Sequence, residues 1–217
     1  MSKLKNTLPS YSLGEELMSS ISHGAGALFG VFALVLCVVK SAMHNSVIGI
    51  AAGAIFGASM ILLYSMSTLY HALGRNRAKA VFRILDHCGI FLLIAGTYTP
   101  YTLVALQGAL GWTLFGIVWG AAILGIALNA VSIERFKVFS MICYLCMGWV
   151  IIFAVKPLLS AIPKESFLLL LWGGIIYTLG AVVFGFGKKL RYIHSVWHFF
   201  VLAGSILHFL SIYLYIL

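Results

Sequence analysis

Residues 47–71 read VIGIAAGAIFGASMILLYSMSTLYH, an apolar run without Asp, Glu, Lys or Arg. A helix needs about 20 such residues to cross the hydrocarbon core of a bilayer. The run is therefore long enough for one transmembrane helix. It ends in a histidine, a residue that is rare and costly within a membrane.

The whole chain shares this apolar character. Of its 217 residues, 62% are hydrophobic and only 9% are charged, whereas soluble domains are about 45–50% apolar and roughly 25% charged. So few charges cannot cover a water-exposed surface. The composition therefore excludes a soluble enzyme, a disordered chain and a fibrous protein, and indicates a polytopic membrane protein.

Seven apolar stretches predict an all-α, seven-transmembrane helix bundle. We expect a short cytoplasmic N-terminal segment over residues 1–19 and a single transmembrane domain over residues 20–217. Pro100 is expected to kink the far end of the third helix, because proline lacks a backbone N–H. The predicted spans are 20–39, 47–73, 81–104, 110–131, 138–159, 167–187 and 192–217.

The basic residues orient this bundle. Lys and Arg number 14 against 5 acidic residues, and 11 of the 14 fall on the side of the N-terminus. Because cytoplasmic loops carry the excess of Lys and Arg, we predict a cytoplasmic N-terminus and an external C-terminus in the plasma or inner membrane. The positive charge is thus explained by topology, and no nucleic-acid partner is expected.

Glycines four residues apart predict close helix packing. Gly49, Gly53 and Gly57 repeat this spacing in the second span, and Gly116 and Gly120 repeat it in the fourth. Small residues let helix backbones approach each other where the surrounding lipid offers no hydrophobic driving force. We interpret all five glycines as packing positions within the bundle.

Four ionisable residues fall within the spans at one shared depth. His71 lies four residues before Arg75, Asp86 lies three after Arg83, and His194 and His198 follow Arg191 by three and seven. At 1.5 Å per residue, each lies roughly 4–11 Å from the cytoplasmic border. Three helices therefore bring polar groups to one shallow layer. Intramembrane ionisable groups are candidates for function.

Their spacing favours a metal site. His194 and His198 lie one helical turn apart on the same face, as do Ser67 and His71. Three histidines with one open position are typical of catalytic zinc. A nearby carboxylate that is not a ligand, such as Asp86, can orient a water and take its proton. Ser67 can support this site.

Simpler interpretations remain open for each residue. His194 and His198 can bind lipid phosphates or loop carbonyls, Asp86 can pair with Arg83, and Ser67 can bond its own preceding turn. His23 is a weaker candidate, which we interpret as a polar residue at a helix start rather than as a supporting residue of the site.

These residues lie in stretches that resemble a known family. SMSTLYH (65–71), RILDHCGIFLLIAGTYTPY (83–101), HSVWH (194–198) and EELMSSISHGAGA (15–27) are together similar to the hemolysin-III branch of the progestin and adiponectin receptor (PAQR) family. This family of seven-helix proteins is grouped with alkaline ceramidases. The resemblance spans the chain in the expected order.

The resemblance implies roles for individual residues. His71, His194 and His198 would bind zinc near the cytoplasmic face, Asp86 would hydrogen-bond the water that completes the site, and Ser67 would belong to the same cluster. It also implies an N-terminus inside the cell. The chain lacks the long N-terminal domain of the animal receptors, so a receptor function for adiponectin is not carried over.

Two functions follow as hypotheses. The first is a zinc-dependent hydrolase of a membrane lipid amide or ester, similar to the ceramidases, with His71, His194 and His198 as ligands and Asp86 and Ser67 as catalytic residues. The alternative is a non-catalytic factor or sensor of membrane homeostasis that zinc merely stabilises. A pore is disfavoured, because no ring of charges lines the spans. The lipid substrate, the oligomeric state and the roles of His23 and Cys88 stay open.

Overall fold

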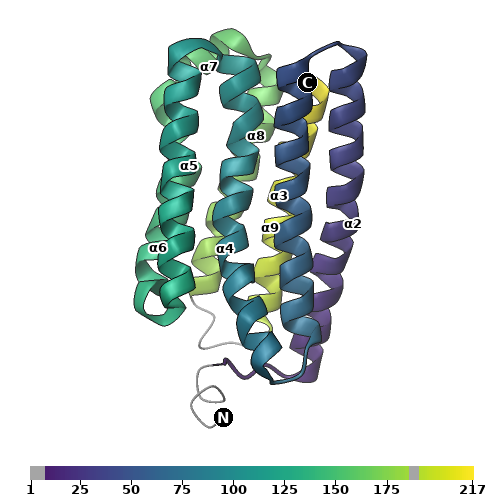
Figure 1. The fold of residues 1–217 in the computed structure, drawn as a ribbon, viewed down its shortest axis with the longest axis vertical. Helices are drawn as coiled ribbons and strands as arrows, with labels where there is room; N and C mark the ends of the chain where they lie inside the picture. Colours follow the sequence, from purple (N-terminus) through teal and green to yellow (C-terminus); the bar gives the residue numbers. More distant parts are fainter. Residues whose placement is uncertain (1–7, 186–190) are drawn as a thin grey trace.

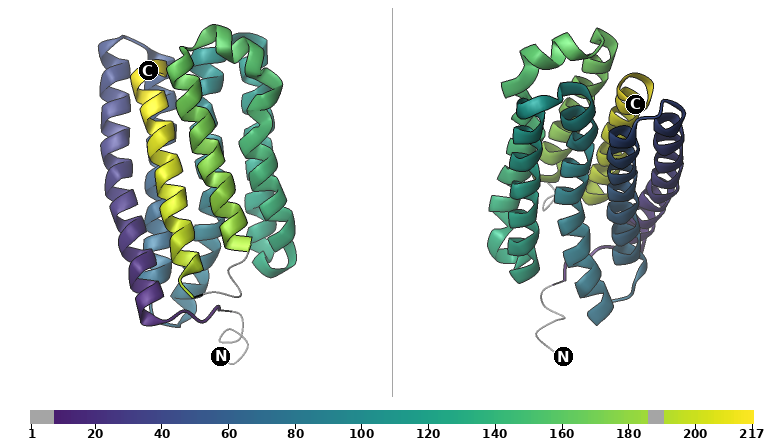
Figure 2. Two further views of the ribbon diagram at one scale, coloured as in Figure 1. Left: turned by 180° about the vertical axis from the view of Figure 1, so that it is seen from behind. Right: turned by 45° about the horizontal axis from the view of Figure 1, so that its top comes forward.

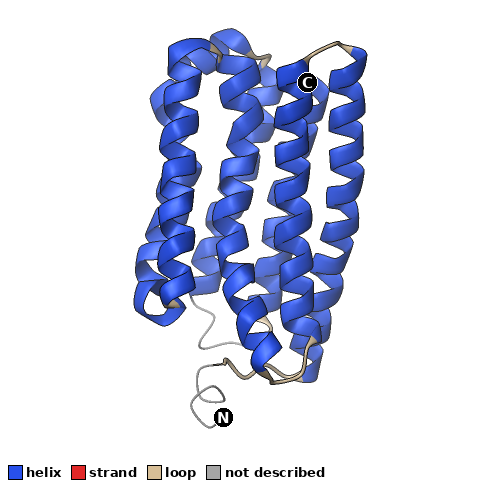
Figure 3. Cartoon of the chain, in the orientation of Figure 1, coloured by secondary structure: helices blue, strands red, loops and turns tan. Residues whose placement is uncertain are grey.

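The computed structural model describes residues 8–185 and 191–217, and the described chain is almost entirely helical (Figure 1, Figure 3). Seven helical spans are long and apolar enough to cross a membrane, which confirms the all-α, seven-span prediction. The protein is therefore a multi-pass membrane protein. The main helices are α2 (Leu13–Met43), α3 (Val47–Ala72), α4 (Arg77–Pro100), α5 (Gly108–Val131), α6 (Ile133–Trp149), α8 (Lys164–Gly185) and α9 (Ile193–Ser211).

The spans form a closed bundle. Helices that follow one another in the sequence pack side by side, and α9 returns to pack against α2 (Figure 2). The N-terminal segment and the α3–α4 connection lie at one end of the bundle, and the C-terminus lies at the other (Figure 1). We call the end at which the described chain begins the basic end, because Arg75, Arg77, Arg135 and Arg191 lie at or beside the helix ends there.

The first helix begins earlier than the sequence predicts. It starts at Leu13 rather than at residue 20. Ser12 and Glu15 form a capping box, in which the Ser12 side chain accepts from the Glu15 backbone N–H and the Glu15 carboxylate accepts from the Ser12 N–H at 2.8 Å. The helix therefore extends beyond the apolar run and carries Glu16 into the bundle.

Three other spans change helix type along their length. The α-helical part of the third span ends at Pro100, and a π-helix continues it over Tyr101–Leu106. This change accompanies the missing N–H of proline, at the site of the predicted kink. The fifth span continues from α6 through a 3-10 turn (Val150–Ala154) into α7 (Val155–Ala161), and a π-turn (Ile212–Ile216) ends the chain.

The glycine prediction holds where α2 packs against α3 and fails for the two glycines of α5. A Cβ added to Gly57 would lie 2.5 Å from the Cα of Leu34, and one added to Gly53 would lie 2.9 Å from the Cβ of Cys37. These contacts bring α2 and α3 together. Gly116 and Gly120, in contrast, would meet no described atom within 4 Å. Our interpretation of that pair as packing positions within the bundle was wrong, because α5 turns this face outward.

Part of the predicted charge pattern lies outside the described residues. Lys3, Lys5, Lys188 and Lys189 belong to it, as does the end of the predicted sixth span at residues 186–187. Within the described part, Arg83 on α4 pairs with Glu134 on α6 near the basic end. This ion pair joins α4 to α6 there.

Candidate metal centre

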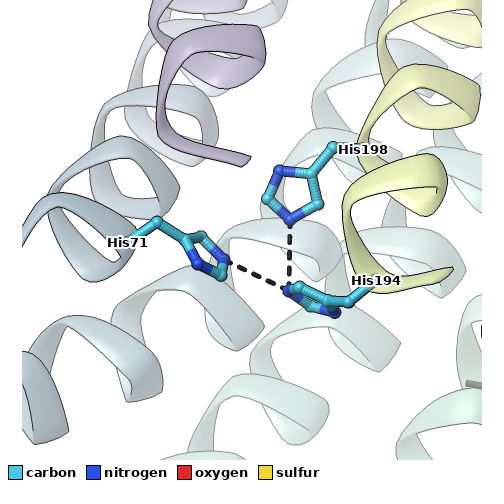
Figure 4. Close-up of side chains that lie close together, drawn as sticks. All are labelled: His71, His194 and His198. Carbon is cyan, nitrogen blue, oxygen red and sulfur yellow. Dashed lines mark hydrogen bonds between the residues drawn. The ribbon is translucent and has the colours of Figure 1, made fainter. Parts of the chain in front are cut away.

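Three histidines converge between the end of α3 and the start of α9 (Figure 4). The Nε2 atom of His194 lies 3.1 Å from that of His71 and 3.2 Å from that of His198. Tetrahedral zinc with bonds of 2.0–2.1 Å to nitrogen separates its ligands by about 3.3–3.4 Å. Two of the three separations are close to this value, and the ligand atoms of all three histidines lie within 4.8 Å of one another, so the group could hold a metal ion.

The hydrogen bonds on the other side of the rings support this fit. His71 Nδ1 lies 2.7 Å from a Glu16 carboxylate oxygen, and His198 Nδ1 lies 3.3 Å from the Ser19 carbonyl oxygen. Because both partners only accept, each Nδ1 carries a hydrogen and donates it. The Nε2 atoms of these two rings are then free to present lone pairs toward His194 Nε2. A cation held there would take one lone pair from each of the three rings.

Contacts between α2 and α9 position two of these rings. The Ser195 hydroxyl donates to the Glu15 carbonyl at 3.0 Å and lies 2.9 Å from the Ser19 hydroxyl. The Tyr192 backbone N–H donates to the Glu15 carboxylate at 2.9 Å. The start of α9 is thus fixed against the start of α2. His194 and His198, one turn apart, then face α3 together.

Glu16 is a site residue that the sequence analysis missed. Its carboxylate bridges His71 and the Lys79 ammonium, with 2.7 Å to each. The capping box of Ser12 and Glu15 was the available signal, because it extends the helix to include Glu16. The contact with His71 itself joins residues far apart in the sequence, so only the fold reveals it.

The segment before α2 covers the centre from the basic end. The ring of Tyr11 stacks on His194, with 4.9 Å between ring centroids and 18° between planes. Arg75 holds the segment by donating to the carbonyls of Leu8 and Pro9, at 3.0 and 3.1 Å. Burial raises the pKa of the Tyr11 phenol above its usual value, so Tyr11 stays neutral.

The structure places Asp86 beside the histidines. Asp86, His194 and His198 line one small cavity of about 50 Å³. A cavity needs roughly 10–15 Å³ to hold a water, which also requires polar partners. The Ser67 hydroxyl is fully buried close to the Asp86 carboxyl, without a hydrogen bond of normal length among the described residues. All five predicted site residues therefore lie in one region.

The structure also locates the two residues whose roles were open. His23 is buried and stacks on His198, with ring centroids 3.7 Å apart. Our interpretation of His23 as a mere helix-start residue was therefore wrong, since its ring forms part of the wall around the centre. Cys88 lies elsewhere: its thiol contacts the Ile126 carbonyl on α5 at 3.7 Å.

A larger, mostly apolar cavity of about 180 Å³ adjoins the small one. It extends between α4, α6, α8 and α9 toward the C-terminal end of the bundle, where Val155 and Phe167 line it. The residues that line both cavities are Leu63, Ile90, Met141, Tyr144, Trp197 and Val201. The histidine centre therefore lies at the end of an apolar space within the bundle.

These features define a multi-pass membrane protein with a buried three-histidine centre that can hold a metal ion. Comparison with known proteins agrees with this class. The family model described as haemolysin-III related matches residues 11–209. The chain belongs to this family.

Individual relatives match over most of their length. The chain is 43% identical to Hemolysin-3 of Bacillus cereus, over 94% of this chain and 92% of that protein. It is 42% identical to a Hemolysin-3 homolog of Bacillus subtilis (strain 168), over 94% and 96%. A more distant similarity, at 27% identity, covers 75% of this chain and 69% of the human monocyte to macrophage differentiation factor.

Proposed function

We propose that the protein is a zinc-dependent hydrolase that cleaves an amide or ester bond of a membrane lipid. The observation that carries the proposal is the convergence of three imidazole Nε2 atoms beside a buried carboxylate, at the end of an apolar cavity. Three neutral nitrogen ligands suit zinc among the common metals. When bound, zinc would supply a Lewis acid that acidifies water and polarises a carbonyl.

The chain's own residues supply the proton transfers. Asp86, which lines the small cavity, orients the attacking water and takes its proton as general base. It then returns that proton to the leaving nitrogen or oxygen as the acyl bond breaks. The buried Ser67 hydroxyl lies near this carboxyl and supports its position.

The surroundings favour a lipid as substrate. An acyl chain fits the apolar cavity, and its carbonyl carbon would then lie near the histidines, where the two cavities share their walls. Such a substrate enters from the membrane, because Tyr11 and its segment cover the centre from the basic end. The alkaline ceramidases, which are grouped with the progestin and adiponectin receptor family that this sequence resembles, act on a lipid amide of this kind.

The test is a lipid-hydrolysis screen with the purified, zinc-loaded protein and its Asp86→Asn variant. Wild type should release fatty acid from a ceramide-like or acyl lipid. The variant should keep its zinc and lose about 10²–10⁴-fold in rate, the usual contribution of a general base. Failure of the zinc-loaded wild type to cleave any lipid in a broad screen would reject hydrolysis.

A second candidate is a zinc-stabilised membrane homeostasis factor without turnover. The observation that favours it is that a metal at this centre would tie α3 to α9, two helices far apart in the sequence. Zinc would then contribute only to stability. Asp86→Asn separates the two proposals. It lowers the rate of lipid hydrolysis under the first, whereas under the second there is no hydrolysis for it to lower.

A further inference from the structure

The Glu16 carboxylate connects three helices at the histidine centre. From α2, its Oε2 accepts from His71 Nδ1 on α3, and its Oε1 accepts from Lys79 Nζ on α4, each at 2.7 Å. Lys79 is itself only 2% exposed and also donates to the Leu73 carbonyl at 3.0 Å. The carboxylate is therefore fixed at both of its oxygens.

The three histidines differ in how their Nδ1 atoms are held. His71 donates to a charged carboxylate, and His198 to a neutral backbone carbonyl at the longer distance of 3.3 Å. His194 Nδ1 has no hydrogen-bond partner among the described residues. Hydrogen bonds to charged groups are shorter and about twice as strong as those between neutral groups. His71 is therefore the most firmly oriented ring of the three.

Lys79 fixes the orientation of the Glu16 carboxylate. Glutamate has a long side chain, and without a partner its carboxylate would sample several orientations near His71. The Lys79 ammonium holds one oxygen, so the other stays aimed at the imidazole. The pair is largely shielded from solvent, with side-chain exposures of 2% and 18%, so screening by water and salt is weak.

We propose that Glu16, held by Lys79, is a positioning residue for the metal ligand His71. It keeps the hydrogen of His71 on Nδ1, turns Nε2 toward His194 and His198, and raises the basicity of that nitrogen. A carboxylate that acts on a ligating histidine in this way typically contributes 10–100-fold to metal affinity. The inference rests on the metal site of the proposed function, but not on hydrolysis.

The test measures zinc affinity of the purified full chain by competition with a chelator. Glu16→Gln and Glu16→Ala should weaken zinc binding by about 10–100-fold, and Lys79→Met should weaken it less, because the carboxylate remains. Glu134→Gln is the matched control, since it removes an ion pair on the same side that involves no histidine. The control should bind zinc like wild type.

Two further measurements distinguish positioning from a structural role. With Co²⁺ in place of zinc, Glu16→Gln should change the visible absorption spectrum, which reports the ligand geometry. The melting temperature of Glu16→Gln should fall below that of wild type by more in the presence of metal than in its absence. Equal zinc affinity and an unchanged Co²⁺ spectrum in Glu16→Gln and wild type would overturn the inference, even if the variant were less stable.

Failure of this inference differs from failure of the proposed function. If wild type binds zinc but cleaves no lipid, hydrolysis is rejected while the affinity comparison still decides the role of Glu16. If wild type binds neither zinc nor Co²⁺, both the metal site and this inference are rejected.

Discussion

The Nε2 atoms of His71 and His194 lie 3.1 Å apart, although the two residues are separated by 123 positions in the sequence. Their approach depends on the return of α9 to the start of α2 and on the packing of α2 against α3. Metal binding at this point should therefore be linked to the stability of the whole bundle.

Gly57 should be sensitive to any side chain, because an added Cβ would meet the backbone of Leu34 at 2.5 Å. Gly57→Ala forces α2 and α3 apart, and overpacking of this kind costs about 1–3 kcal/mol. We expect a lower melting temperature in detergent. Gly116→Ala is the control, since its added Cβ meets no described atom within 4 Å. Equal melting temperatures for the two variants would contradict the packing described here.

Tyr11 should slow the escape of bound metal toward the basic end. Its ring stacks on His194, and an aromatic contact contributes ~0.5–1.5 kcal/mol, which corresponds to a rate change of about two- to tenfold. Zinc release from Tyr11→Ala to a water-soluble chelator should be faster by that factor. Tyr11→Phe, which keeps the ring, should release zinc at the wild-type rate. Identical release rates in all three proteins would show that the segment does not cover the site.

Filling the apolar cavity should select against long substrates. Gly174 lines this cavity, and nothing lies within 4 Å of a Cβ added there. If the protein hydrolyses lipids as proposed, Gly174→Leu should reduce cleavage of long-chain lipids more than that of short-chain ones. Gly185→Leu, on the same helix but outside the cavity, should leave the preference unchanged. A uniform effect of Gly174→Leu on all chain lengths would place the acyl chain elsewhere.

The orientation predicted from Lys and Arg can be tested with fusions at the C-terminus. An external C-terminus should make a fused alkaline phosphatase active, because this enzyme folds only outside the bacterial cytoplasm. It should leave a fused green fluorescent protein dark, because that protein does not become fluorescent when it is exported as an unfolded chain. The opposite pattern would place the basic end outside and reverse the topology.

The sequence predicts the fold well because apolar length is a local property. The stretch at residues 47–71 identifies one span by itself, and the distances of His71, Asp86 and His198 from neighbouring basic residues assign all three to one layer. The structure places these residues together in that layer. Local periodicity and charge were sufficient for this part.

The remaining features depend on contacts between distant residues. Glu16 was missed because the apolar run begins after it, and His23 was misassigned because no local pattern shows that it stacks on His198. Gly116 and Gly120 repeat the spacing of Gly53 and Gly57, yet they face outward. Which face of a helix meets a neighbour is set by the whole bundle rather than by spacing.

The most direct test of the histidine centre is the metal content per chain. Wild type and His198→Ala, purified in detergent after growth with zinc, are compared by mass spectrometry of metals. We expect close to one zinc ion per wild-type chain and its loss in His198→Ala, together with a lower melting temperature, because metal binding stabilises the folded state. Absence of bound metal from wild type, even after zinc is supplied, would contradict the metal centre.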